Sequence, residues 1–250
     1  MRTLTRPVKG TEVRVEPATS PGIRINGIPA TLDAVSKADR RVDLADDEAR
    51  SFIVEHALAP LGLLGITAAE IVGRRDAWSF ERPEHRFCYS TDLTPEHVVG
   101  HPAGLPNPAI VDAIDETTIT GTVDERRTIS EAVEYTTETG HIRLAPASYG
   151  AGLQFDISLD TASFDCTIDP TASTAPALVE TISTATTPYL DPTPKEAIRH
   201  TIADLVADIG IVGGFDDLNV TATLGGAYHA LTIGVARRAR RLDRGVIQTE

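Results

Sequence analysis

The chain has 250 residues, of which 41% are hydrophobic, and a formal net charge of −13. This length suits one large domain or two of about 125 residues each, and it can bury a core without disulfides. The acidic balance argues against nucleic acid or an anionic membrane as a general partner, because both would be repelled. A saline habitat would favour the same acidity, and an ordinary acidic protein from a GC-rich genome explains it as well. Cys88 and Cys166 suggest no disulfide framework.

Targeting and membrane signals are missing from the sequence. The first residues hold no apolar core of the kind found in a signal peptide. The most apolar stretch, residues 57–73, is interrupted by Pro60, Glu70 and glycines, so it predicts buried helix, turn and strand rather than a membrane span. We therefore expect a cytoplasmic monomer without an integral membrane segment, acting on a small molecule.

The first half of the chain begins with short strands. Alternating polar and apolar residues predict strands at residues 11–16, 22–27, 41–44, 66–72 and 117–123. The acidic residues 46–48 are typical of a helix N-terminus, since carboxylates favour the positive end of the helix dipole. We expect that helix at residues 48–61, with Phe52, Ile53, Leu58 and Leu61 on its apolar side. Residues 74–110 predict an irregular insert.

The second half repeats this order of elements. Strands are predicted at residues 131–135, 141–145, 153–159 and 219–224. Thr193 and Pro194 favour the start of a helix at residues 195–209. Gly225 and Gly226 lead into a last helix, which ends in an arginine-rich run that predicts a solvated face or, alternatively, a phosphate patch. The sequence thus predicts an α+β fold of two similar α/β-sandwich domains, residues 1–124 and 125–250, with the active site between them.

A short pattern occurs in both predicted helices. Residues 54–61 read VEHALAPL and residues 198–205 read IRHTIADL, so His56 and His200 occupy the same place. Asp204 follows His200 by four residues, which is about one helical turn, so both side chains point the same way. In duplicated domains His56 would lie opposite His200. Two imidazoles and one carboxylate match a catalytic zinc site with an open coordination position.

Further residues suit roles around such a metal. Glu55 precedes His56 and is placed to deprotonate a metal-bound water rather than to bind the metal. His229 follows a glycine turn at a helix start, where it could act as general acid on a leaving amine. A single histidine on a helix more often packs than binds metal. His85, His97 and His101 form a loose group, which leaves a second metal site open.

These segments resemble the zinc-dependent UDP-3-O-acyl-N-acetylglucosamine deacetylases of lipid A biosynthesis. Residues 54–58 are similar to the family's V-E-H-L-L helix, residues 200–208 to its H-K-I-L-D-x-I-G-D helix and residues 228–231 to its G-H-A-L. The resemblance implies two similar α+β domains with zinc between them. The ligands that it implies are His56, His200 and Asp204.

The resemblance also implies the catalytic residues. Glu55 corresponds to the general base and His229 to the general acid. Asp208 falls where the family orients the general-acid histidine. Residues 183–187 are similar to the family's S-R-A-R-T, which implies that Thr187 helps to hold the oxyanion.

Several departures concern substrate binding. The family's G-L-H-S-G and D-G-S-A-G-P-F segments are missing, and Thr201 replaces a lysine that contacts phosphate. The insert that sheathes the acyl chain is also missing between Thr187 and His200. We therefore expect a metal-dependent deacetylase that cleaves a linear amide C–N bond in a smaller or altered nucleotide sugar or amino sugar. The alternatives are a non-catalytic metal- or ligand-binding relative and an unrelated α+β protein with coincidental motifs.

Overall fold

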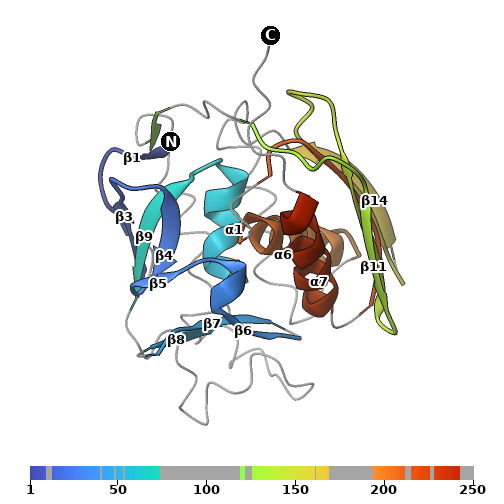
Figure 1. Cartoon of the computed structure of the whole chain (residues 1–250), viewed down its shortest axis with the longest axis horizontal. Helices are drawn as coiled ribbons and strands as arrows, with labels where there is room; N and C mark the ends of the chain where they lie inside the picture. The colour runs from blue at the N-terminus through green and yellow to red at the C-terminus, as the bar shows by residue number, and fades with distance from the viewer. Residues whose placement is uncertain are drawn as a thin grey trace.

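The protein is an α+β fold in which helices lie between sheets (Figure 1). The computed structural model describes residues 1–9, 13–39, 41–47, 49–52, 54–73, 119–121, 126–160, 162–168, 194–211, 215–225 and 228–242. Helices α1 (Glu55–Leu63), α6 (Pro194–Gly210) and α7 (His229–Ala239) form the middle layer. One sheet from the first half covers one side of this layer, and a sheet from the second half covers the other. A second, small sheet from the first half lies across the lower end of the helices in this view. Among the described residues, no helix combines the length and the hydrophobicity that crossing a bilayer requires.

A seven-stranded sheet is built from the first half of the chain. Its strands are β1 (Thr3–Leu4), β2 (Val8–Lys9), β3 (Val13–Pro17), β4 (Gly22–Ile25), β5 (Ile28–Pro29), β9 (Ala68–Gly73) and β10 (Ile119–Thr120). Strand β9 pairs antiparallel with β3 and parallel with β4. The β4–β5 hairpin turns at Asn26 and Gly27, both with positive φ, as a tight two-residue turn requires. Strands predicted at 11–16, 22–27, 66–72 and 117–123 thus all meet in one sheet.

A small antiparallel sheet leads into α1 and corrects the sequence prediction there. It consists of β6 (Val35–Ala38), β7 (Val42–Ala45) and β8 (Arg50–Phe52). The acidic segment that predicted a helix start instead makes a hairpin turn, because Asp46 accepts the Ala49 N–H at 2.7 Å and donates its own N–H to the Ala49 carbonyl. The helix therefore begins at Glu55 rather than near residue 48, and Phe52 ends a strand.

The second half forms a five-stranded sheet. Its strands are β11 (Val133–Thr137), β12 (Gly140–Pro146), β13 (Leu153–Leu159), β14 (Ala162–Ile168) and β15 (Leu218–Leu224), in the order β11-β12-β15-β13-β14. Only β13 and β15 run parallel. Leu153, Phe155 and Ile157 are buried and alternate with more exposed residues, so one face of β13 covers the helical layer. Strand β14 was not predicted, whereas the other four were.

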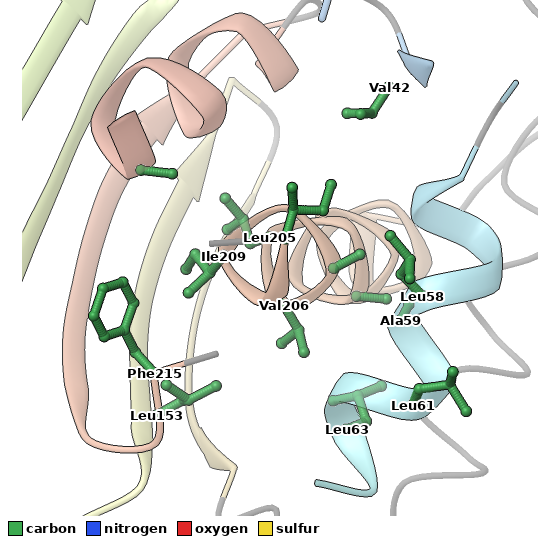
Figure 2. Packing of buried hydrophobic residues seen from close by; sticks show 14 of the residues in the cluster. Val42, Leu58, Ala59, Leu61, Leu63, Leu153, Leu205, Val206, Ile209 and Phe215 are labelled. Carbon is green, nitrogen blue, oxygen red and sulfur yellow. The ribbon is translucent and has the colours of Figure 1, made fainter. Parts of the chain in front are cut away.

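Helices α1 and α6 pack directly on each other in the core. A Cβ atom at Gly62 would lie only 2.8 Å from Val206 Cγ1, so this glycine allows a close crossing. Leu58, Leu61 and Leu205 are buried beside it (Figure 2). Leu58 and Leu61 were predicted on this apolar side. The crossing brings the first turn of α1 to the middle of α6, where the candidate site lies.

Some predictions fall outside the described residues. They are the insert at 74–110, the helix cap at Thr193, and the domain boundary between residues 124 and 125. The division into residues 1–124 and 125–250 stays a prediction.

Candidate active site

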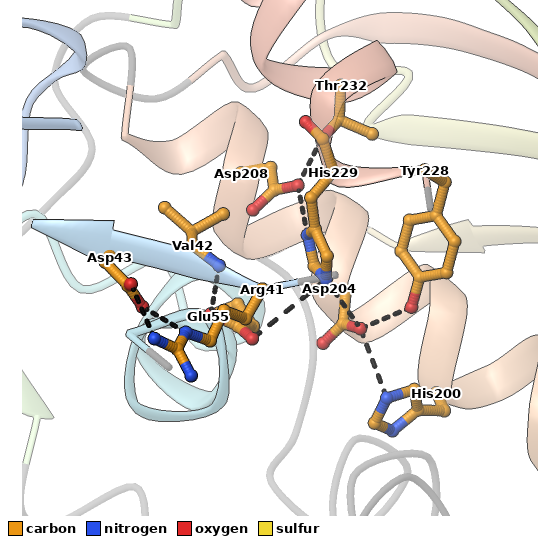
Figure 3. Close-up of polar contacts among 10 residues, drawn as sticks. All are labelled: Arg41, Val42, Asp43, Glu55, His200, Asp204, Asp208, Tyr228, His229 and Thr232. Carbon is orange, nitrogen blue, oxygen red and sulfur yellow. Dashed lines mark hydrogen bonds and ion pairs between the residues drawn. The ribbon is translucent and has the colours of Figure 1, made fainter. Parts of the chain in front are cut away.

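Three helices bring polar side chains to one buried place (Figure 3). Glu55 is the first residue of α1, and His229 is the first residue of α7. His200, Asp204 and Asp208 follow each other at four-residue spacing along α6, so they form one stripe on that helix. All except His200, which is half-buried, are buried. Ionisable groups are seldom buried together without a chemical or structural reason.

The imidazole of His229 is held by α6. Its Nδ1 lies 2.8 Å from Oδ2 of Asp208, and the Thr232 hydroxyl donates a hydrogen bond to the same oxygen. The same hydroxyl lies 3.0 Å from the His229 carbonyl oxygen, so its single proton has two acceptors within reach, one on α6 and one in the first turn of α7. Nδ1 carries a proton and donates it in the hydrogen bond to the Asp208 carboxylate. Nε2 is therefore the ring nitrogen that can take part in proton transfer.

Nε2 of His229 faces two other carboxylates. It lies 4.0 Å from Oε1 of Glu55 and 3.7 Å from Oδ2 of Asp204. Oε2 of Glu55 accepts the backbone N–H of Val42 at 3.0 Å, and Val54 N–H bonds the Val42 carbonyl, so β7 fixes the start of α1. The second carboxylate oxygen of Glu55 is thereby directed toward His229.

Asp204 connects the remaining groups. Its Oδ2 lies 3.2 Å from Nε2 of His200 and accepts a hydrogen bond from the Tyr228 hydroxyl at 2.5 Å. The Tyr228 ring also lies beside His229, with the ring centroids 4.7 Å apart. One carboxylate oxygen is therefore shared by groups from α6 and from the start of α7.

Burial and charge shift the proton affinities of the cluster. Burial raises the pKa of Glu55 to about 8, against the opposing charge of His229. Burial alone would lower the pKa of His229, but the charges of Asp208, Glu55 and Asp204 outweigh it and raise this pKa to about 10. Burial also raises the pKa of Asp208. The cluster thus binds protons more tightly than the same groups would in water, as expected where carboxylates crowd together.

The residues present suit a zinc ion by their chemistry. Nε2 of His200 and Oδ2 of Asp204 lie side by side, and imidazole nitrogen and carboxylate oxygen are both good zinc donors. Oδ1 of Asp208 is buried without a hydrogen-bond partner, a further sign of excess acceptors. No group of three possible ligands forms among the described side chains. The third predicted ligand, His56, follows Glu55 in α1, but its side chain is not among the described side chains.

The sequence predicted most of this cluster. The structure brings together Glu55, His200, Asp204, Asp208 and His229. Thr187 and the histidine group at residues 85–101 lie outside the described residues. Tyr228, Thr232 and Val42 were not predicted to have a role in the site. The three-residue spacing from His229 could have indicated Thr232, but the Val42 contact depends on the tertiary fold.

The comparisons with known proteins leave the family open. No model of a protein family matches this sequence, and the search of curated proteins finds no significant match. The resemblance to the deacetylases therefore stays a prediction that rests on the motifs.

Proposed function

We propose that this protein is a zinc-dependent amide hydrolase, similar to the UDP-3-O-acyl-N-acetylglucosamine deacetylases, with a smaller or altered sugar substrate. The observation that supports the proposal is the pairing of Glu55 with His229 beside His200 and Asp204. A carboxylate and an imidazole facing one point supply the base and the acid that amide hydrolysis needs. These residues come from helices far apart in the sequence, so local folding alone does not explain their meeting.

Under this proposal His56, His200 and Asp204 hold the zinc. A bound Zn²⁺ polarises an amide carbonyl and lowers the pKa of water toward neutrality. The cluster holds more carboxylates than imidazoles. This suits a divalent cation, because a nearby cation favours the charged form of a carboxylate. Glu55 would then be ionised near neutral pH and able to accept a proton.

Glu55 is proposed to act as general base. Its Oε1 faces the centre of the cluster while its Oε2 is held by the Val42 N–H. A base that is fixed at one oxygen keeps the other in a single position, which lowers the entropy cost of proton transfer. Glu55 takes the proton of the attacking water.

His229 is proposed to act as general acid. With Nδ1 bonded to Asp208, the protonated ring carries its second proton on Nε2, which points into the cluster. The Asp208 carboxylate, hydrogen-bonded to Nδ1, favours the protonated ring. Nε2 donates its proton to the nitrogen of the leaving amine as the C–N bond breaks. Asp208 and Thr232 orient the ring.

We also propose that the two halves are similar sandwich domains with the site between them. Each half contributes a sheet and a helix of the repeated pattern, and α1 and α6 meet at the cluster. Thr187 would contribute to oxyanion binding from the second half.

Metal analysis and hydrolysis assays test the proposal together. Purified wild-type protein should bind one equivalent of zinc, and His56→Ala and Asp204→Ala should each lower bound zinc. Glu55→Gln should keep zinc but lose hydrolysis on a panel of N-acetylated amino sugars and nucleotide sugars. Glu131→Gln, at an exposed residue, is the matched control.

Two outcomes would count against the proposal. Unchanged zinc in both ligand variants would show that the metal assignment is wrong. Bound zinc without hydrolysis in the wild type, or with the same hydrolysis in Glu55→Gln, would favour a non-catalytic metal-binding protein.

A further inference from the structure

A cavity lies on the side of α6 that faces away from the candidate active site. Its volume is about 470 Å³, and it is bounded by strands β4 and β5, by α1, by the last turns of α6 and by residues 215–216. Val206, Ile209 and Gly210 of α6 line it. At about 100° per residue, these three positions lie on the opposite side of the helix from the stripe of site residues. The proposed hydrolysis therefore makes no use of this cavity.

Apolar side chains form most of the wall. Ile23 comes from β4, Leu58 from α1 and Val206 from α6. Leu153 and Phe215 close the side toward the five-stranded sheet, and Val206 points into the space between them and α1 (Figure 2). A cavity of about 150 Å³ with such walls takes up benzene, so one about three times as large has room for a body of about 10–18 carbon atoms.

Asp216 supplies a hydrogen-bond acceptor in this wall. Its Oδ2 accepts the backbone N–H of Arg127 at 2.8 Å. Among the described residues, no hydrogen bond or ion pair reaches its Oδ1. Burial raises the pKa of Asp216, because the carboxylate is only partly solvated. A ligand that donates one hydrogen bond would supply the missing partner of Oδ1.

The charges around the cavity favour a neutral ligand. The charge of Arg127, together with that of Arg126, opposes the effect of burial and lowers the pKa of Asp216, so positive charge already offsets this carboxylate. Arg24 is exposed and donates to the Gly27 carbonyl at 2.8 Å, so its charge stays outside the cavity. A charged ligand would thus lose its hydration without meeting an unbalanced opposite charge.

We propose that this cavity binds a neutral apolar alcohol with a body of about 10–18 carbon atoms. The body lies against Leu58, Val206 and Phe215, and the hydroxyl group donates a hydrogen bond to Oδ1 of Asp216. The site does not rest on the proposed function, since it shares neither residues nor ligand class with the hydrolysis of a sugar amide.

Fluorescence titration with a matched set of naphthalenes, substituted at the same ring position, tests the ligand class. Naphthalenemethanol should bind roughly tenfold more tightly than methylnaphthalene or its own methyl ether, because neither can donate a hydrogen bond to Asp216. Naphthoate and naphthylmethylammonium should bind at least about tenfold more weakly than the alcohol, because each loses the hydration of a charge. Benzyl alcohol should also bind at least about tenfold more weakly, because one ring buries less apolar surface.

Variants assign the binding to this cavity. Asp216→Ala should lower the affinity for naphthalenemethanol about tenfold and leave that for methylnaphthalene unchanged. Asp165→Ala, at an exposed residue of β14 outside the wall, should change neither affinity. A Cβ atom at Gly210 would meet no atom within 4 Å, so Gly210→Leu should occupy the cavity without a clash. This variant should lower both affinities at least about tenfold.

Methyl NMR on the wild type keeps the test independent of the folding of the variants. Naphthalenemethanol should shift the methyl signals of Ile23, Ile209 and Ile211, which line the cavity, and not that of Ile142 in β12. Any of three results overturns the proposal. These are no binding of naphthalenemethanol, equal or tighter binding of the ether, the acid, the ammonium compound or benzyl alcohol, and methyl shifts confined to residues outside the cavity.

Discussion

Nδ1 of His229 lies 2.8 Å from Oδ2 of Asp208, and both side chains are buried. The two residues are on different helices, so this hydrogen bond depends on the docking of α7 against α6. A carboxylate that is bonded to Nδ1 fixes the tautomer and orientation of an imidazole and stabilises its protonated form. The docking of α7 against α6 therefore sets the tautomer, the orientation and the protonation of His229.

Asp208→Asn should slow hydrolysis by about 10²–10⁴-fold in kcat, with a smaller change in KM, if His229 is the general acid. The negative charge of Asp208 helps to raise the pKa of His229, so its removal should lower that pKa. The activity should then fall at a lower pH on the alkaline side than in the wild type. A kcat–pH profile checks this, and an unshifted alkaline limb would contradict the positioning role.

Thr232→Val should destabilise the protein by about 1–3 kcal/mol, because it removes a donor from a buried carboxylate while keeping the side-chain shape. Urea denaturation of wild type and variant measures the difference. Thr221→Val is the control, since Thr221 is exposed on β15 and its replacement should change the free energy of unfolding by less than about 0.5 kcal/mol. Equal effects at both positions would show that the Asp208 contact contributes little.

Tyr228→Phe should weaken zinc binding about 10- to 100-fold, since the hydroxyl holds the oxygen of Asp204 that also faces His200. Competition with a chromophoric chelator measures the zinc dissociation constant. Tyr135→Phe, at a half-buried residue of β11, is the matched control. If both variants bind zinc as tightly as the wild type, Tyr228 does not position Asp204.

The fold was predictable where the signals are local. Helix α6 was predicted at residues 195–209 and runs from Pro194 to Gly210, because proline at a helix start and apolar periodicity both act within a few residues. The start of α1 was not predictable in this way. Acidic residues favour both helix N-termini and turns, and here the pairing of β8 with β7 decides between them.

In the candidate site, too, contacts within one helix were predictable and contacts between elements were not. The proximity of His200 and Asp204 follows from their four-residue spacing on one helix. The meeting of His229 with Asp208 was expected only from the family resemblance, because no local rule joins residues of separate helices. The hydrogen bond from Val42 to Glu55 depends on where a strand edge meets a helix start, which the sequence alone does not specify.

The stability of the metal-free protein should fall as pH rises from about 4.5 to about 8. Burial raises the pKa of Glu55 from 4.5 to about 8, so over that range the folded state keeps a proton that the unfolded chain releases. The raised pKa of His229 acts in the same direction, with its contribution lost as pH rises through about 10. Urea denaturation of Glu55→Gln, which stays neutral, should show a shallower fall between pH 5 and 8.

The matched control for this pH series is Glu131→Gln, at an exposed residue. Its stability should follow the wild-type curve. A Glu55→Gln curve parallel to that of the wild type would mean that Glu55 is ionised in the metal-free protein, against the effect of its burial.

Asp217→Asn should destabilise the fold by about 3–5 kcal/mol while leaving zinc affinity unchanged. Asp217 is buried and accepts two hydrogen bonds from Arg126, each at 2.8 Å, together with the N–H groups of Gly150 and Gly152. This cluster ties residues 126–128 to two turns of the five-stranded sheet, and none of these four hydrogen bonds involves a residue of the candidate site. Replacing one oxygen by an amide leaves the Arg126 charge buried without its full partner. Urea denaturation and zinc titration of the same variant separate the two effects, and a loss of zinc affinity in the folded variant would show that the two clusters are coupled.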